Sequence, residues 1–475
     1  MSIDHELEDW QEKEHRIRAT EHEAQANLAT VLQLCATGKL RCSEKTRRPS
    51  AATVAAITEA LDGGDFYEHE AIAAFAWPLL LQAGGLATLA SGRLTLTPRG
   101  RTALAKPAHE SIAALWQRWQ KNTLLDEFSR IEEIKGQRAA NVLTAARPRR
   151  ELVGQALTTR TAGQWITVDD LFARMRRAGQ DPVITRSERA LWKLYLEDPQ
   201  YGSLGYDGHH DWSLLQGRYT LAVLFEYAAV LGLIDIDYIP PAGARTDYQH
   251  NWGGDYLDQL SRYDGLLAIR LNPLGAYATD QAATYTPSSK PQPATPAGRI
   301  TVLPNHDIAA LDGLAPGDAL LLDAFADKAS GHVWSLTPRS LLRAVDAGRD
   351  LTELRRYLES ASRHPLPQTV TTLLDDAARR LGQVRDTGPV HLIECADGAI
   401  AALLAGDRRL RTLVTRLGER HFAVPADRLA AFRKAALAQG YPLDRSDDHR
   451  TPGPIAQVAA RTRASGDGRE PTRTR

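Results

Sequence analysis

The sequence predicts a helix-rich α+β protein made of several domains. The chain has 475 residues, which is more than one ordinary hydrophobic core accommodates. A pattern of a glycine-stopped helix, two strands and a helix that begins at a proline occurs twice. A stretch rich in Ala, Thr, Ser and Pro over residues 279–298 separates both copies from a third region. We therefore expect two related domains, a flexible linker over residues 279–298, and a third α+β domain.

The N-terminal segment, residues 1–37, has the spacing of a helix. Apolar or small side chains recur at intervals of three and four residues from Leu7 to Val31, and Glu14 and Glu21 interrupt the stripe. This pattern predicts one long amphipathic helix. The helix could pack against its own domain or pair with a helix of a partner protein, and the interrupted stripe leaves both interpretations open.

The next segment is basic. Residues 39–48 contain five basic side chains and one acidic side chain, and Ser50 has the position and chemistry of an N-cap for a helix that begins at Ala51. Because the whole chain balances 58 basic against 58 acidic residues, any nucleic-acid site must be a local patch. We expect weak DNA binding without sequence preference. The candidate DNA-binding residues are Lys45, Arg47, Arg48, Arg93 and Arg99.

The first copy of the repeated pattern follows this segment. An apolar helix over residues 71–83 is stopped by two glycines, alternating strands flank a Ser91–Gly92 turn, and Thr97 with Pro98 begins the next helix. This order of a helix, a two-stranded wing and a further helix is typical of a winged-helix domain. We therefore expect residues 38–150 to form a winged-helix-like domain.

The second copy lies in residues 151–278. An apolar helix over residues 219–231 is stopped by Gly232, two strands follow, and Asn272 with Pro273 begins a helix. We expect a second winged-helix-like domain here, with an insertion over residues 240–264 between its strands. The insertion carries the aromatic or imidazole side chains of Tyr248, His250, Trp252 and Tyr256. These rings could stack on bases or pack the long loop onto its own domain.

Motifs for the common nucleotide chemistries are missing from the sequence. It holds no G-x-x-x-x-G-K-[ST] loop, no dinucleotide glycine fingerprint, no H-E-x-x-H pair and no G-x-S-x-G elbow. We therefore expect no ATP hydrolysis, no enzymatic activity and no cofactor. A nuclease or modification enzyme with an unrecognised site remains an alternative.

Metal binding is not expected either. The adjacent His209 and His210 point in different directions on any regular element. The three cysteines, Cys35, Cys42 and Cys395, have no metal-ligand spacing and are expected to be buried thiols.

The third region carries the most specific pattern. Residues 300–308 predict a strand with a turn, residues 333–342 a strand that enters a capped helix, and residues 364–370 a proline-containing turn that opens a helix. Over residues 299–444 the chain resembles the N-terminal domain of XPB-type helicases and of bacterial helicase-associated proteins. In XPB-type helicases two ATP-driven motor domains follow that domain, whereas about 30 residues follow it here. The arrangement is therefore more similar to the TFIIH subunit that grips the helicase than to the helicase.

The resemblance implies a non-catalytic adaptor that binds DNA and acts with a superfamily-2 helicase or nuclease in DNA maintenance or phage defence. The residues expected to contact that helicase-class partner are Pro365, Pro367 and Gln368. A winged-helix transcriptional regulator that works without a motor is the alternative.

Both ends of the chain have distinctive compositions. Residues 445–475 hold Arg, Thr, Gly and Ser and are expected to form a disordered basic tail. The first residues lack the basic and apolar parts of a signal peptide, and no apolar run approaches the length of a membrane span. We therefore expect a cytoplasmic protein.

Overall fold

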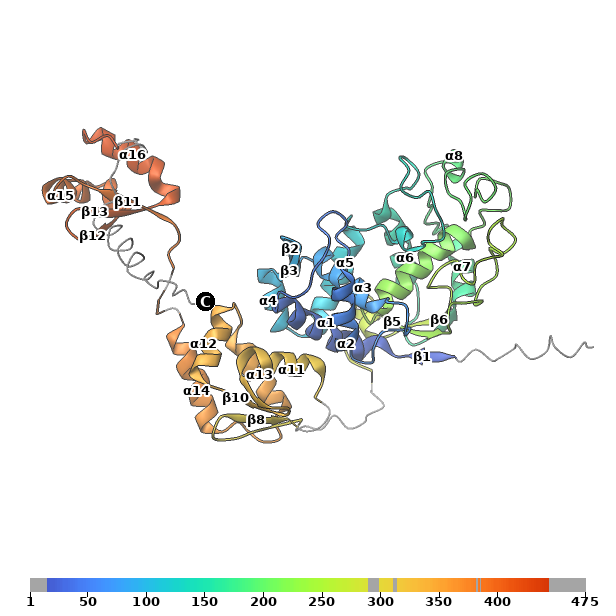
Figure 1. Ribbon diagram of the computed structural model, residues 1–475, viewed down its shortest axis with the longest axis horizontal. Coiled ribbons are helices and arrows are strands. Elements are labelled where there is room, and N and C mark those ends of the chain that lie inside the picture. The colour runs from blue at the N-terminus through green and yellow to red at the C-terminus, as the bar shows by residue number, and fades with distance from the viewer. Residues whose placement is uncertain (1–14, 289–298, 311–313, 382, 385, 444–475) are drawn as a thin grey trace, which may run out of the picture. The chain divides into compact units, whose positions relative to one another are not determined.

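The structure is a computed structural model that describes residues 15–288, 299–310, 314–381, 383–384 and 386–443. It has the expected helix-rich α+β class, with small sheets set among many helices (Figure 1). The chain divides into two compact units, Met1–Arg380 and Leu381–Arg475, which are described separately. No helix in the described ranges has the length and apolar character needed to cross a membrane.

The first region contains the predicted helix, wing and helix. Ser50 accepts a hydrogen bond from the Thr53 amide, and Thr97 accepts one from the Gly100 amide, as the sequence predicts for two helix N-caps. Ser91 and Gly92 both have positive φ (49° and 72°), which gives the tight turn of a two-residue hairpin. The elements are α1 (Thr20–Ala36), α2 (Ala51–Ala60), α3 (Ala73–Ala83), β2 (Ala87–Ala90), β3 (Arg93–Leu96), α4 (Pro98–Leu104) and α5 (Ala108–Lys121).

The N-terminal helix is shorter than expected. It begins at Thr20, and Arg16–Arg18 instead form strand β1, which pairs antiparallel with β5 (Ile234–Tyr238). That pairing joins segments more than 200 residues apart in the sequence, so local periodicity could not reveal it. Leu28 and Val31 of α1 are buried in the core of the chain itself. The structure thus favours packing within the domain over pairing with a partner helix; residues 1–14 lie outside the described part.

The second region repeats the order of the first. A helix and a short strand, α6 (Ala146–Thr158) and β4 (Trp165–Thr167), are followed by helix α7 (Val168–Arg177), a long helical run, two paired strands and a helix. The run consists of η2 (Ser213–Gly217), α9 (Arg218–Ala222) and η3 (Val223–Ala229), and the later elements are β5, β6 (Leu266–Leu271) and α10 (Pro273–Ala278). Asn272 caps α10 by accepting from the Gly275 amide, as predicted. The sheet has the order β1-β5-β6-β4. Two short helices, η1 (Glu127–Arg130) and α8 (Glu188–Leu191), lie in the connections.

The two regions share one hydrophobic core, although the sequence suggested a boundary near residue 150. Buried side chains from Ala24 to Ala278 form a continuous cluster. The ring of Trp119 on α5 stacks on that of Tyr227 on η3, with centroids 4.5 Å apart. Such a stack joins the first region to the second, so the two copies form a single packed body.

Buried ion pairs hold the long connections of the second region in place. The Nε atom of Arg218 lies 2.8 Å from Oδ1 of Asp264, and both side chains are fully buried. The same guanidinium donates to both carboxylate oxygens of Asp247 at 2.6 and 2.8 Å. Because Asp247 and Asp264 both belong to the insertion between β5 and β6, Arg218 ties that insertion to helix α9.

The third region has its own core and sheet. Strands β7 (Ile300–Val302), β8 (Asp307–Ala310), β9 (Asp327–Ser330) and β10 (Val333–Ser335) are ordered β7-β8-β10-β9, and the helices are α11 (Pro316–Phe325), α12 (Pro338–Asp346), α13 (Leu351–Ala361) and α14 (Gln368–Arg380). Helix α11 packs against α1 (Figure 1). Gln33 of α1 donates to the Glu353 carboxylate of α13 at 2.6 Å.

The connection between the second and third regions was expected to be a flexible linker over residues 279–298. Its first part is attached to α1, because Tyr285 donates to the Glu21 carboxylate at 2.7 Å and the Ser288 amide donates to it at 3.1 Å. Residues 289–298 lie outside the described part.

The second unit is a small α+β body. It contains β11 (Val390–Glu394), α15 (Gly398–Gly406), η4 (Leu410–Thr412), β12 (Thr415–Leu417), β13 (His421–Pro425), η5 (Ala426–Arg428) and α16 (Leu429–Ala438), with strand order β11-β13-β12. Phe422 and Phe432 lie in its separate core. The sequence suggested one domain over residues 299–444, whereas the structure divides that range after Arg380. The described residues between 381 and 389 are all exposed, as expected for a connection between separate cores.

Candidate nucleic-acid interface

The wing of the first region is extended by a third, short strand-like segment. The Cys42 amide donates to the Gly92 carbonyl at 3.1 Å, and the Leu94 amide donates to the Leu40 carbonyl at 2.9 Å. This pairing sets Arg41 directly opposite Arg93. Two like charges at opposed positions repel each other, so the pair favours an anion nearby.

The turn after this segment is held firmly against the wing. The Glu44 carboxylate accepts a hydrogen bond from the Gly92 amide at 2.9 Å, and the Arg47 carbonyl accepts one from the Gln82 side chain at 3.1 Å. Arg47 has a positive φ of 62°. These bonds hold the backbone that carries Lys45 and Arg47 next to the wing that carries Arg93.

Three of the five predicted DNA-binding residues therefore lie on one surface. The side chains of Lys45, Arg47 and Arg93 are exposed, as is that of Arg41, and none of the four has an ion-pair partner among the described residues. We call Arg41, Lys45, Arg47 and Arg93 the wing surface. Arg41 was missed as a site residue, although it lies within the basic segment that pointed to this surface.

The other two predicted residues lie elsewhere. Arg48 is half-buried, and its guanidinium donates to the Ser129 hydroxyl at 2.9 Å, so it serves the packing of η1. Arg99 lies at the start of α4 and lines a pocket between α4 and α5. Arg48 and Arg99 are therefore not counted in the wing surface, and DNA contact by any of the five residues stays a prediction.

The helices before the two hairpins are buried. Helix α3 contains no charged residue, and eight of its side chains, from Ala73 to Leu81, are buried. The helical run of η2, α9 and η3 is buried along most of its length as well. Helix α3 therefore presents no charged side chain that could read base edges in a DNA groove.

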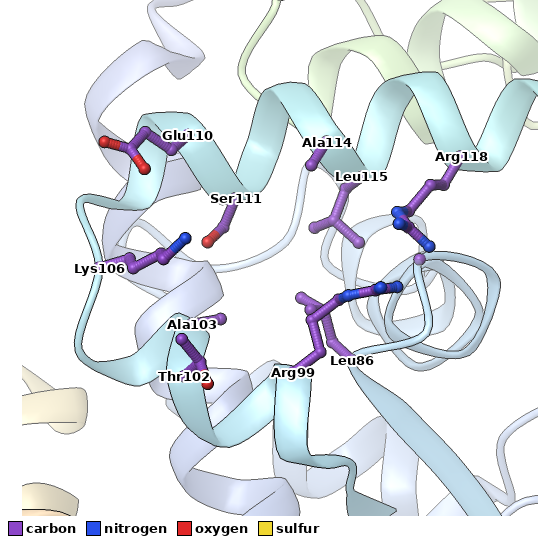
Figure 2. A pocket seen from close by; sticks show the side chains of 11 residues that line it. Leu86, Arg99, Thr102, Ala103, Lys106, Glu110, Ser111, Ala114, Leu115 and Arg118 are labelled. Carbon is purple, nitrogen blue, oxygen red and sulfur yellow. The ribbon is translucent and has the colours of Figure 1, made fainter.

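The pocket between α4 and α5 has a volume of about 200 Å³. Its lining includes Arg99, Lys106 and Arg118, together with Ser111 and the apolar side chains of Leu86 and Leu115. Figure 2 shows the guanidinium groups of Arg99 and Arg118 directed toward one another, while the carboxylate of Glu110 points away from them. Lys106 and Arg118 were not predicted, because they are 7 and 19 residues from Arg99 and line the same pocket only when α5 folds back along α4.

The aromatic insertion of the second region has buried and exposed rings, and the buried ones pack the loop onto its own domain. Tyr248 is buried and donates to the Leu257 carbonyl at 3.0 Å, whereas Trp252 and Tyr256 are 46 % and 77 % exposed. Tyr201 lies against Trp252, with ring centroids 5.6 Å apart. The segments that carry these rings, residues 195–211 and 248–260, contain six acidic residues and no Lys or Arg. A surface of that charge repels phosphate, which argues against base stacking here.

The predicted partner-binding residues lie in the turn before α14. Pro365 and Gln368 are exposed, and Pro367 is half-buried. Thr369 donates to the Pro304 carbonyl at 2.7 Å, which attaches the turn to the loop after β7. The Pro367 carbonyl accepts from the Val370 amide at 3.0 Å, so the turn opens the helix as predicted.

The surroundings of His209, His210 and the three cysteines indicate that these side chains serve the fold. His209 and His210 hydrogen-bond to backbone carbonyls at 3.3 and 3.1 Å, and the described ranges hold no group of three His, Cys, Asp or Glu side chains suited to a metal ion. All three cysteines are buried, as predicted. Burial raises the pKa of the Cys42 thiol to about 11, although the nearby Arg47 charge opposes the shift.

One segment of the chain matches a known protein family. Residues 302–418 match a family model described as "Helicase conserved C-terminal domain". The matched segment begins in β7 and ends just after β12, so it includes parts of both compact units. No curated protein matches the chain. The match supports a helicase-associated protein, and it does not extend to the wing surface or the pocket.

Proposed function

We propose that this protein is a non-catalytic adaptor that binds double-stranded DNA without sequence preference and acts with a helicase-class protein. The XPB-like resemblance of residues 299–444 and the helicase family match at residues 302–418 support the association with a helicase. The wing surface supports the DNA contact. The observation that carries that part is the gathering of four exposed cations, none with an acidic partner in the described ranges, on one hairpin and its adjoining turn.

The mode of DNA binding follows from what is exposed. Helix α3 has no charged side chain to place in a groove, while the wing presents arginine and lysine to phosphates. Phosphate contacts release counterions and give affinity that falls steeply with salt but varies little with sequence. The adaptor is therefore expected to bind many DNA sequences with similar affinity.

The test is a salt titration of the full-length chain with a labelled duplex, followed by fluorescence anisotropy. Changing Lys45, Arg47 and Arg93 together to Gln should weaken binding and flatten the slope of log K against log salt by about 0.9 for each phosphate that the variant no longer neutralises. The matched control changes three exposed cations outside the wing surface, Lys121, Arg138 and Arg189, to Gln. Equally weakened binding in both triple variants, or unchanged binding in the first, would refute the assignment of the wing surface.

The partner contact is proposed for the turn of Pro365, Pro367 and Gln368. Two prolines fix φ at two positions of this turn and so reduce the entropic cost of ordering it against a partner. The test places a photo-cross-linking amino acid at Gln368 in the full-length chain and, as a control in the same unit, at the exposed Arg339. Cross-linking in the native host, with DNA digested, should give a protein with helicase motor domains from position 368 and not from position 339.

The non-catalytic part of the proposal rests on the lack of a phosphate-binding glycine loop in the sequence. The purified chain should therefore not hydrolyse ATP, with or without DNA. Turnover that persists through purification and is abolished by a point mutation in this chain would contradict the proposal.

A further inference from the structure

The pocket between α4 and α5 is built by close backbone approach. A Cβ atom on Gly84 would lie 2.1 Å from Cδ2 of Leu115, and one on Gly100 would lie 2.0 Å from the carbonyl oxygen of Leu86. The position of Gly100 therefore needs glycine, because a Cβ there would push α4 away from the backbone before β2, whereas a Cβ at Gly84 would force the buried Leu115 side chain to shift. Leu86, Ala103 and Leu115 belong to the hydrophobic core, so they give the pocket an apolar floor.

Three cations surround this floor. Arg99 comes from the first turn of α4, Lys106 from the connection to α5, and Arg118 from the last turn of α5. None of these three side chains has a hydrogen-bond or ion-pair partner in the part of the chain that the structure describes. Glu110 is the acidic residue of the lining, and Figure 2 shows Glu110 and Lys106 at the end of the pocket away from the two guanidiniums.

The positive charges around this pocket have no acidic partner in the described part of the chain to balance them. Like charges held around one small cavity repel each other, and a bound anion converts the repulsion into attraction. A guanidinium presents parallel N–H donors that match two oxygens of one phosphate group, so two facing guanidiniums match a group with three peripheral oxygens better than a carboxylate with two. The volume of about 200 Å³ is below the roughly 300–1,000 Å³ of pockets that take drug-sized ligands.

We propose that this pocket binds a phosphate monoester, with the guanidiniums of Arg99 and Arg118 on the phosphate oxygens. The apolar floor of Leu86 and Leu115 accepts the carbon side of the ester. Two sources share this chemistry: a free mononucleotide and the 5′-phosphate at the end of a DNA strand. The site is separate from the wing surface, since none of the four wing residues lines the pocket.

The experiment measures binding to the full-length chain by calorimetry and anisotropy. The probes are dAMP, a 5′-phosphorylated oligonucleotide and the same oligonucleotide with a 5′-hydroxyl. Changing Arg99 or Arg118 to Gln should weaken binding of the phosphorylated probes by about tenfold or more, as expected when a charge-assisted hydrogen bond is removed. Lys121→Gln, three residues after Arg118 on α5 and not part of the lining, is the matched control and should bind normally.

Each outcome bears on the proposal. The proposal is supported if the Arg99 and Arg118 variants bind the phosphorylated probes more weakly while their thermal unfolding is unchanged. The phosphorylated probe that binds more tightly then shows whether the ligand is a free mononucleotide or a DNA 5′-end. Equal binding of the 5′-hydroxyl oligonucleotide would assign the contact to backbone phosphates and overturn the monoester site. Failure of all probes to bind the folded protein at millimolar concentration would also overturn it. The triple Gln variant of Lys45, Arg47 and Arg93 should still bind dAMP, so failure of the wing proposal and failure of this one are distinguishable.

Discussion

The first and second regions share an order of elements and differ in the connection between their paired strands. Strands β2 and β3 are joined by the two residues Ser91 and Gly92, whereas residues 239–265 separate β5 from β6. The short connection exposes arginines on an open hairpin. The long one returns to the body of the protein and is held there by the buried contacts of Arg218 with Asp247 and Asp264.

This difference gives the two regions surfaces of different charge. The first hairpin carries positive charge without partners, which suits a contact with phosphates. The second region presents exposed aromatic rings among acidic side chains. The arginines of its insertion have ion-pair partners within the protein, Arg245 with Asp169 and Arg262 with Glu70 of the first region. Repetition of an element order therefore does not imply repetition of a surface, because the connections decide which charges reach solvent.

The largest expected effect is on the anchoring of the long connection. Arg218→Ala leaves the buried carboxylate of Asp264 without its counter-ion, and removal of one partner of a buried pair costs about 3–5 kcal/mol of folding free energy. Denaturant unfolding followed by circular dichroism measures this destabilisation. Lys121→Ala, at an exposed position, should change stability by less than about 0.5 kcal/mol. A similar small change for Arg218→Ala would show that the insertion is held by other contacts.

A second prediction concerns the thiols beneath the first hairpin. Burial raises the pKa of Cys42 to about 11 and that of Cys35 to about 12, far above the value of about 8.5 for a free thiol. Because the thiolate is the reactive form, a disulfide reagent at pH 8 should label neither residue in the folded protein. In denaturant both should react rapidly. Rapid labelling of Cys42 in buffer would mean that the hairpin opens far more readily than its pairing suggests.

A third, smaller effect tests the short turn. Gly92 has a φ of 72°, and a Cβ there would make only ordinary contact with the Cys42 carbonyl at 3.8 Å, so Gly92→Ala strains only the backbone and should cost about 1–2 kcal/mol. Gly331 lies between β9 and β10, in open space and without a positive φ, and Gly331→Ala is the matched control with little expected change. Thermal unfolding compares the two variants. Equal effects would argue against a left-handed turn at the wing.

The smallest expected effect is at the aromatic surface. Changing Trp252 and Tyr256 together to Ala removes two exposed rings from an acidic surface, and affinity for duplex or single-stranded DNA should change by less than about twofold, because repelled phosphates do not bring bases near those rings. Anisotropy at low salt measures the affinity. A loss of binding free energy comparable to the roughly 1–3 kcal/mol typical of a stacked base would show that nucleic acid contacts the second region. The contrast between the two regions would then be wrong.

Local features of the fold were predictable from the sequence alone. The caps at Ser50, Thr97 and Asn272 and the Ser91–Gly92 turn appear where the residue types require them. In each case the decisive interaction is a hydrogen bond or a backbone angle within three or four residues, so neighbours in the sequence are neighbours in space. The basic segment likewise indicated the wing surface, because the charges lie close together along the chain.

Only the tertiary structure decided which side chains those elements expose and which distant residues meet. It paired β1 with β5, buried the charge-free helix α3, turned Arg48 toward Ser129 and brought Arg118 to Arg99. The sequence does show α3 to be apolar, but not which surfaces cover it. The physical reason is that these outcomes depend on packing between segments tens to hundreds of residues apart, where the gain from burial and ion pairing outweighs local preference.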